Sequence, residues 1–144
     1  MIRFAHTIIY IFSYDIWFYF SHVLLHTRML YKMIHYKHHS INHKTMTMGD
    51  AYEGHLLESP FQGVGVFIPL FFLSFDIYTL FASLILINIR GMLRHDTRFI
   101  WLIGNHHILH HRYPQSNFGE YWLDNLLGTA HLDKNDYVYG AIYI

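Results

Sequence analysis

Three apolar stretches constrain this chain more than any other feature, because each is long enough to be buried as a helix. They span 4–20, 61–75 and 77–89, and Ser74–Asp76 separates the last two as a predicted turn. Crossing a bilayer takes roughly 20 helical residues, with a lower limit near 17, so the first stretch qualifies by itself. The other two predict a tight helical hairpin that enters or just crosses the membrane.

Composition supports this interpretation. Charged residues make up 14% of the chain, against about 25% in soluble domains, and apolar residues make up 53%. A buried helix pair in a soluble protein remains the alternative. The chain has 144 residues, which predicts a single domain over 1–144 with no fused electron carrier. The zero net charge argues against a nucleic-acid partner, and the absence of cysteine excludes disulfides and thiolate-bound iron–sulfur clusters.

The cationic residues predict the orientation of the chain. Only Arg3 precedes the first apolar stretch, and the other nine Lys and Arg residues follow it. By the positive-inside bias, segments 21–60 and 90–144 both face the cytoplasm. No small-residue cleavage site follows the first stretch, so we expect an uncleaved anchor rather than a signal peptide.

Histidine is the most unusual component, with 14 residues, and eight of these fall into repeated patterns. His22 and His26 form H-x-x-x-H, and the pattern H-x-x-H-H occurs twice. A given three-histidine pattern should arise by chance roughly 0.1 times in such a chain. Residues i, i+3 and i+4 share one face of a helix, so each box predicts convergent imidazoles. The two longer boxes are His35, His38 and His39, and His107, His110 and His111.

Eight imidazoles on one side of a membrane exceed the needs of one metal ion and predict two. Imidazole suits iron, copper, zinc and nickel, so the ligand type leaves the metal open. Neither E-x-x-H nor H-E-x-x-H occurs, which disfavours a carboxylate-rich di-iron bundle and a zinc protease. The favoured interpretation is an all-histidine di-iron centre that activates O2. A pH-sensing cluster is the alternative, although it would not need matched spacings.

Other histidines lie outside this pattern. We expect His6 to be interfacial or hydrogen-bonded, and His43 and His131 to be surface residues. His106 is off the period of its box and is left out of the ligand set.

The boxes and their surroundings resemble the fatty acid hydroxylase/sterol desaturase superfamily of membrane di-iron enzymes. The first box matches its D-x-x-x-Y-x-x-H pattern with Asp15, Tyr19 and His22, and the second matches H-x-x-H-H-S. Residues 51–58 resemble A-x-x-x-H-P-x-E, and 94–96 resemble the I-H-D of sterol C-5 desaturases. Residues 117–129 resemble N-Y-G-x-x-x-x-x-W-D-x-L-F-G-T, the most specific element.

The resemblance implies an all-α fold of membrane helices with a cytosolic histidine-rich cap. It implies two iron ions, which zinc can replace in purified protein, with no haem or flavin and no catalytic residues beyond the metal ligands. It also implies O2-dependent hydroxylation or desaturation of a lipid, sterol or fatty-acyl, with electrons from a donor such as cytochrome b5 and its reductase. In a eukaryotic host the location would be the endoplasmic reticulum. Asp15 is a candidate to orient an imidazole N–H, or a polar group on the helix face. The ligands carried over by position are His22, His26, His35, His38, His39, His55, His95, His107, His110 and His111.

Several departures keep other functions open. Val23 replaces the usual Arg, Leu56 replaces Pro, and Gly91 stands where fatty acid 2-hydroxylases carry another histidine, which favours the sterol side of the family. About twenty residues precede the first box, so we expect the family's first transmembrane helix to be lacking. A catalytically silent relative that only binds metal, and a membrane metal or haem carrier, are the alternative functions.

Overall fold

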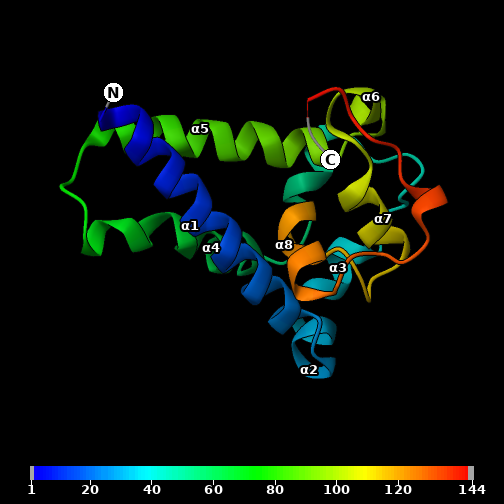
Figure 1. Cartoon of the computed structure of the whole chain (residues 1–144). Coiled ribbons are helices and arrows are strands. Elements are labelled where there is room, and N and C mark those ends of the chain that lie inside the picture. Colours follow the sequence, from blue (N-terminus) through cyan, green and yellow to red (C-terminus); the bar gives the residue numbers. More distant parts are fainter. Residues whose placement is uncertain (1, 143–144) are drawn as a thin grey trace.

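The computed structural model describes residues 2–142, which form helices, turns and extended loops with no β-strand among them. Figure 1 shows two long helices and a shorter helical segment extending to one side, and a group of short helices at their other end. The long helices are α1 (Ile2–Leu25) and α5 (Ile77–Arg94). The rest are α2 (Arg28–Leu30), η1 (Tyr31–His35), α3 (Tyr36–His39), η2 (Met48–Tyr52), α4 (Glu58–Gly63), η3 (Val64–Phe71), η4 (Thr97–Phe99), α6 (Ile100–Ile103), α7 (His106–Arg112), α8 (Tyr121–Leu127) and η5 (Lys134–Asp136).

Helices α1 and α5 are long and apolar enough to cross a membrane. At 1.5 Å per residue they reach about 36 Å and about 27 Å, against a hydrocarbon core of about 30 Å. Their outer faces carry exposed apolar side chains, such as Phe12 and Phe20 on α1 and Phe81 and Ile85 on α5. Such rows of exposed apolar side chains suit contact with lipid tails, and they argue against the alternative of a buried helix pair.

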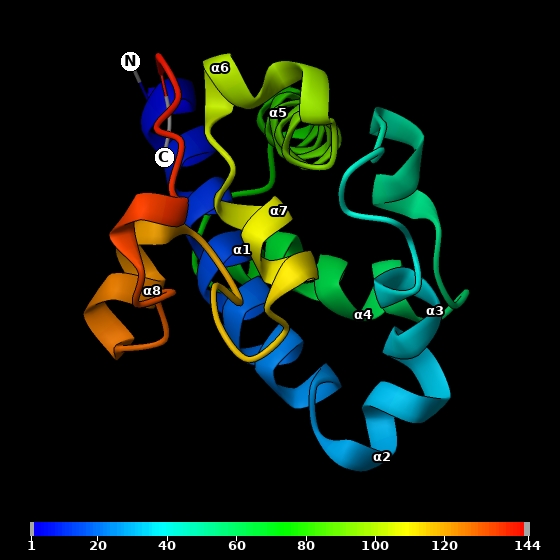
Figure 2. The ribbon, with the colours of Figure 1, turned by 90° about the vertical axis from the view of Figure 1, so that its right-hand side faces the viewer.

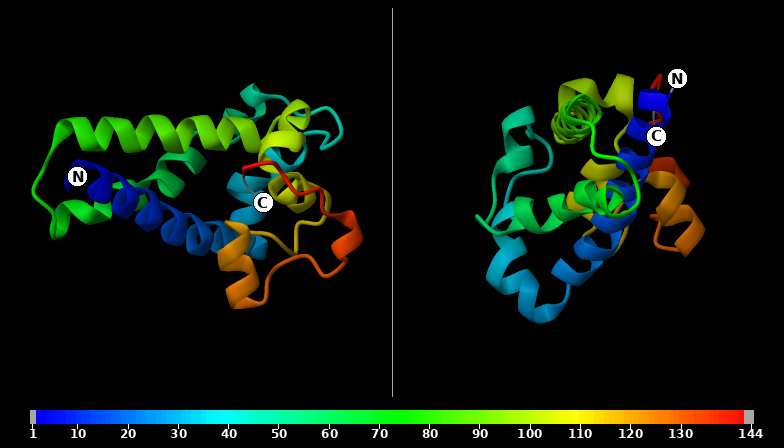
Figure 3. Two further views of the ribbon diagram at one scale, coloured as in Figure 1. Left: turned by 45° about the horizontal axis from the view of Figure 1, so that its top comes forward. Right: turned by 90° about the vertical axis from the view of Figure 1, so that its left-hand side faces the viewer.

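The apolar core lies where α1, η3 and α5 meet. Tyr10, Val66, Leu80 and Ile87 form its buried centre, one or two from each segment. Arg3 pairs with Asp76 at one end of this layer, at 2.9 Å, and Asp76 also caps α5 by accepting a hydrogen bond from the Tyr78 amide. The left panel of Figure 3 shows α1 and α5 running lengthwise away from the short helices.

The second apolar stretch differs from the predicted hairpin arm, because it is not one continuous α-helix. It forms α4 and then a 3-10 helix, η3, before the chain turns back into α5. The indole of Trp17 donates to the Phe61 carbonyl at 2.8 Å, and the Ser13 hydroxyl donates to the Gly65 carbonyl at 3.0 Å. A Cβ at Gly65 would lie 2.5 Å from the Trp17 Cβ, so only glycine permits this approach. Pro69 has no backbone N–H, so the Gly65 carbonyl lacks the i+4 donor of an α-helix and accepts from Ser13 instead.

A buried charge network joins the long helices to the segment before α8. Asp15 on α1 pairs with Arg90 on α5, and Glu120 contacts both Arg90 and Arg94. Each carboxylate is at most 5% exposed. Because unpaired charges are costly to bury, this network fixes α1, α5 and the segment before α8 in one arrangement. Figure 2, viewed along α5, shows α7 between α3 on one side and α8 on the other.

Candidate metal centre

Nine of the ten predicted ligands converge at the end of α1 and α5 that carries the short helices. They form two groups, in each of which the nearest ring nitrogens all lie within 4.8 Å of one another. We call them the five-histidine group, His22, His26, His35, His39 and His110, and the four-histidine group, His38, His95, His107 and His111. The groups adjoin, since the rings of His39 and His111 stack with centroids 4.7 Å apart.

Each H-x-x-H-H box divides its side chains between the two groups. In the second box, the i, i+4 pair His35 and His39 enters the five-histidine group, and His38 enters the other. In the third box the pattern is reversed, because His107 and His111 enter the four-histidine group and His110 the five-histidine group. Each box therefore links both groups, which explains the repeat of an i, i+3, i+4 spacing.

The Nε2 atoms of each group face one another at short range. In the five-histidine group, His22 and His35 lie 3.0 Å apart, and His26 and His110 lie 3.1 Å apart. In the four-histidine group, His95 lies 2.9 Å from His107 and 3.2 Å from His38. Nitrogens about 2.1 Å from a shared ion at ordinary coordination angles would be about 3.0–3.4 Å apart. These separations fit shared metal ligation.

Backbone carbonyls determine which ring nitrogen carries the proton. The Nδ1 of His38 donates to Glu53 O at 2.8 Å, and the Nδ1 of His95 donates to Gly91 O at 2.7 Å. A carbonyl only accepts, so the proton is on Nδ1 and a neutral ring presents a bare lone pair at Nε2. The short contact between these two Nε2 atoms therefore joins two lone pairs, which repel. A bound cation removes that repulsion, so the donor set fits a metal ion.

Burial keeps these rings neutral. It lowers the pKa of His39 to about 2 and that of His95 to about 3, and it lowers the pKa of His107, His110 and His111 well below the usual value. Metal binding needs neutral imidazole. The rings are thus in the ligating form at physiological pH.

Glu58 is a site residue that the sequence analysis did not assign. Its Oε1 accepts from His35 Nδ1 at 2.8 Å, and the carboxyl is buried. Burial raises the pKa of Glu58 to about 8, so the metal-free pocket disfavours its charge, and a cation on His35 would restore it. The signal was the glutamate that ends the 51–58 motif.

Asp15 and His55 lie elsewhere than expected. Asp15 pairs with Arg90 rather than with an imidazole. His55 is exposed, lies outside both groups, and its Nδ1 accepts from the Leu57 amide at 3.2 Å. The turn at 54–57 uses this ring locally, which holds it away from the centre.

Three other histidines of segments 21–60 and 90–144 lie outside both groups as well. His43 is half-buried beside Lys44. His131 pairs with Asp136 at 2.9 Å and stacks on Tyr113. The Nε2 of His106 lies 3.0 Å from Asp124 Oδ2.

A cavity of about 210 Å³ leads from the histidines into the membrane-like layer. Its histidine lining is uneven, with His38, His95 and His107 from the four-histidine group and His22 from the other. Apolar side chains of α1, η3 and α5 line the part away from the histidines, and Gln62, Asn88, Arg90 and Arg94 add polar groups. Such a cavity suits a mostly apolar ligand with a polar end.

Comparisons with known proteins agree with this geometry. The sequence profile described as fatty acid hydroxylase matches residues 7–129. The chain is also similar to Delta(7)-sterol 5(6)-desaturase ERG3B of Gibberella zeae, with 30% identity over 150 aligned residues. That alignment covers 96% of this chain and 46% of the other protein, so the chain spans about half the length of this relative. No solved structure matches the chain.

Proposed function

The chain belongs to the fatty acid hydroxylase family, and from this premise we propose that it is a membrane-bound di-iron oxidoreductase acting on a lipid. The reaction is hydroxylation or desaturation of a C–H bond with O2 and externally supplied electrons. The observation that carries the proposal is the convergence of nine buried or half-buried histidines into two adjoining groups beside one cavity.

The nine histidines of the two groups are the proposed ligands, one ion to each group. Iron bound there would supply the oxidising power, with O2, that removes hydrogen from an unactivated C–H bond. In hydroxylation, O2, two electrons, two protons and the C–H bond give an alcohol and one water. In desaturation the same inputs remove two hydrogens and give a C=C bond and two waters. Zinc can occupy such sites in purified protein, because imidazole ligands also suit zinc.

The residues of the chain bind and position the substrate. Phe18, Val66, Leu84 and Ile87 form an apolar wall that excludes water from the bound lipid. Arg90 and Gln62 face the same cavity and can bind a hydroxyl or headgroup. The reacting carbon would lie at the end where His38, His95 and His107 line the cavity.

A sterol is the favoured substrate, and the named relative is a Δ7-sterol 5(6)-desaturase. Gly91, which stands where fatty acid 2-hydroxylases carry another histidine, also favours a sterol over a fatty acid as the substrate. Conversion of a fatty-acyl lipid instead of a sterol is the other possible result of a lipid assay. Electrons would come from a separate donor such as cytochrome b5 and its reductase, with the histidine groups facing the cytoplasm, at the endoplasmic reticulum in a eukaryotic host.

The test is metal content and turnover of detergent-purified protein from iron-replete cells. We expect about two metal ions per chain, and O2-dependent conversion of an added sterol or acyl lipid when reductant and donor are present. A matched pair of variants supports the reading: His110→Ala should end turnover and His131→Ala should not. Two ions without turnover on any lipid would favour the silent relative, and an intense Soret band would indicate a haem carrier.

A further inference from the structure

The segment after α7 carries a group of buried polar contacts that metal ligation alone does not explain. We propose that it is a clamp that positions two ligands of the five-histidine group and so sets the affinity of that group for its ion. We call it the Asp124 clamp, made of Asn117, Asp124, Thr129 and the backbone of 116–119. The inference rests on the proposed metal-binding role of the histidines.

The clamp touches the ligands through two carbonyls of one short loop. The Nδ1 of His22 donates to Phe118 O at 2.5 Å, and the Nδ1 of His110 donates to Ser116 O at 2.6 Å. These ligands come from different helices, α1 and α7, and their rings lie 4.4 Å apart between centroids. The loop thus fixes the tautomer and orientation of both rings, leaving each Nε2 bare toward the other ligands.

The loop needs an unusual backbone to present both carbonyls. Asn117, between them, has φ of +60°, the only positive value among the non-glycine residues that the structure describes. Its side chain, fully buried, is held at both ends: Nδ2 donates to His106 O at 3.0 Å, and Oδ1 accepts from Tyr137 OH at 2.9 Å. Asparagine tolerates this left-handed conformation better than most residues, and these bonds keep it there.

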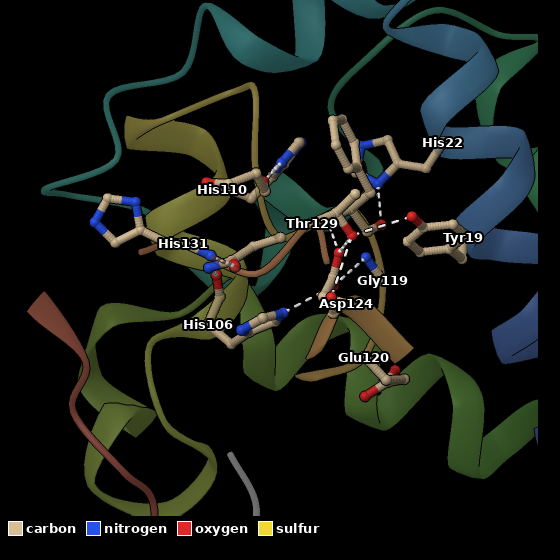
Figure 4. Close-up of polar contacts among 12 residues, drawn as sticks. Tyr19, His22, His106, His110, Gly119, Glu120, Asp124, Thr129 and His131 are labelled. Carbon is tan, nitrogen blue, oxygen red and sulfur yellow. Dashed lines mark hydrogen bonds and ion pairs between the residues drawn. The ribbon is translucent and has the colours of Figure 1, made fainter. Parts of the chain in front are cut away.

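Asp124 holds the other side of the loop. Its Oδ1 accepts from the Phe118 amide at 2.8 Å and from Thr129 Oγ1 at 2.7 Å. Its Oδ2 accepts from the Gly119 amide at 2.8 Å and lies 3.0 Å from His106 Nε2. Figure 4 shows this carboxylate at the centre of the contacts, with Thr129 joining it to Tyr19. All four of its partners are donors, so the site requires two acceptor oxygens.

Tyr19 brings the clamp back to the first box. Its hydroxyl lies 3.0 Å from Thr129 Oγ1, and it stands one helical turn before His22. A Cβ on Gly119 would lie 3.0 Å from the Tyr19 ring, so the loop packs directly on α1. The clamp therefore sets the position of the loop relative to the helix that carries His22.

The four-histidine group has no such device among residues 2–142. The Nδ1 atoms of His107 and His111 have no hydrogen-bond partner there. His95, the C-cap of α5, donates to Gly91 O in the last turn of that helix, and His38 donates to Glu53 O, which is not part of the clamp. Loss of the clamp should therefore weaken one ion and spare the other.

The main test is Asp124→Asn, which keeps the size of the side chain but replaces one acceptor by a donor. Purified apoprotein is titrated with Co²⁺, following visible absorption and bound metal per chain. We expect two ions in the wild type, and in the variant a Kd raised about 10–100-fold for one ion and unchanged for the other. Asp133→Asn is the matched control, since Asp133 is exposed and caps a short helix, a role that asparagine also fills.

A second pair of variants keeps the test valid if Asp124→Asn does not fold. Thr129→Val removes the hydroxyl between Asp124 and Tyr19 with little change in shape, and Thr129→Ser keeps that hydroxyl. We expect selective weakening of one ion in Thr129→Val and normal binding in Thr129→Ser. Circular dichroism in detergent checks that each variant is folded.

The outcomes separate the clamp from the proposed function. Folded variants that bind both ions as tightly as the wild type, or that weaken both equally, would overturn the clamp. If wild-type protein binds fewer than two ions, the di-iron proposal fails first, and the clamp falls with it.

Discussion

In the five-histidine group, four ligands come as two i, i+4 pairs, whereas the four-histidine group contains one such pair, His107 and His111. The supports of the rings differ as well. Three rings of the larger group are held at Nδ1 by partners remote in sequence or by the clamp loop: Phe118 O, Ser116 O and the Glu58 carboxylate. In the smaller group, two rings are held by backbone carbonyls.

This difference indicates that the two groups have different roles in binding metal. The larger group would retain an ion more tightly, since more of its donors are held in position before an ion binds. The smaller group has one donor fewer and supplies three of the four histidines that line the cavity. An ion there would keep more open positions, beside the place where a substrate would bind.

Removal of one ligand from each group gives the largest expected effect. His38→Ala leaves three donors in the smaller group, and His110→Ala leaves four in the larger. Both should abolish turnover, but His38→Ala should lower the metal content to about one ion per chain, while His110→Ala should still bind two at saturating metal. Elemental analysis of protein dialysed against buffer that contains saturating metal, with the buffer as the blank, measures this. If His110→Ala lost an ion and His38→Ala kept two, the five-histidine group would not be the tighter of the two.

Loss of the carboxylate support should have the next largest effect. Glu58→Leu removes the acceptor for His35 Nδ1 and should weaken binding to the five-histidine group about 10–100-fold, or about 1.4–2.7 kcal/mol. Glu58→Gln keeps an acceptor oxygen and should lose less. Titration of the apoprotein with Co²⁺ gives both affinities, and a parallel loss in the four-histidine group would contradict the assignment.

Acid should destabilise the metal-free protein. The unfolded chain takes up protons on its histidines at a pKa near 6.5, whereas burial lowers the pKa of His95 to about 3 and that of His39 to about 2. The stability that neutral rings provide is therefore complete above pH 6.5 and is lost as pH falls below it, by at most about 1.4 kcal/mol per ring and pH unit. Thermal melting of apoprotein from pH 7.5 to pH 5 should show a falling Tm. A Tm that is flat or rises toward pH 5 would contradict this. In protein loaded with metal, the Tm should begin to fall only at a lower pH.

His55→Ala should have the smallest effect. The ring is exposed and outside both groups, so metal content and turnover should match the wild type. A loss of one ion would show instead that His55 completes the four-histidine group in the bound protein, and would make the two groups equal in number.

Local spacing predicted much of the centre, because i, i+3 and i+4 positions face one way whatever surrounds them. It did not reveal that each H-x-x-H-H box divides between the two groups, since that depends on how α1, α7 and the η1–α3 segment meet. Asp15 shows the same limit: its partner, Arg90, is 75 residues away, and sequence offered only the nearby imidazoles. The supports on Phe118 O and Ser116 O are backbone atoms of a loop, which no side-chain pattern encodes.

The apolar stretches show a similar limit to what the sequence alone predicts. Composition was sufficient to predict α1 and a helix in the third apolar stretch, and that helix, α5, starts at the expected residue, Ile77. In η3, Pro69 cannot donate the α-helical bond to Gly65 O, and Trp17 and Ser13 donate to the Phe61 and Gly65 carbonyls. Hydrophobicity alone could not anticipate those contacts.

The π-helical turn η1, Tyr31–His35, has a consequence for insertions and deletions. A π turn accommodates one more residue than an α turn and directly precedes the remaining box residues. Deleting one residue there would convert the π turn into an α turn and leave His35 and His39 in register, whereas inserting a further residue between Arg28 and His35 would rotate them by about 100° relative to α2. Both would then turn away from His22 and His26 together. Insertions in this short segment should therefore be far less tolerated than a single deletion or substitutions of Lys32 or Met33, whose side chains are exposed.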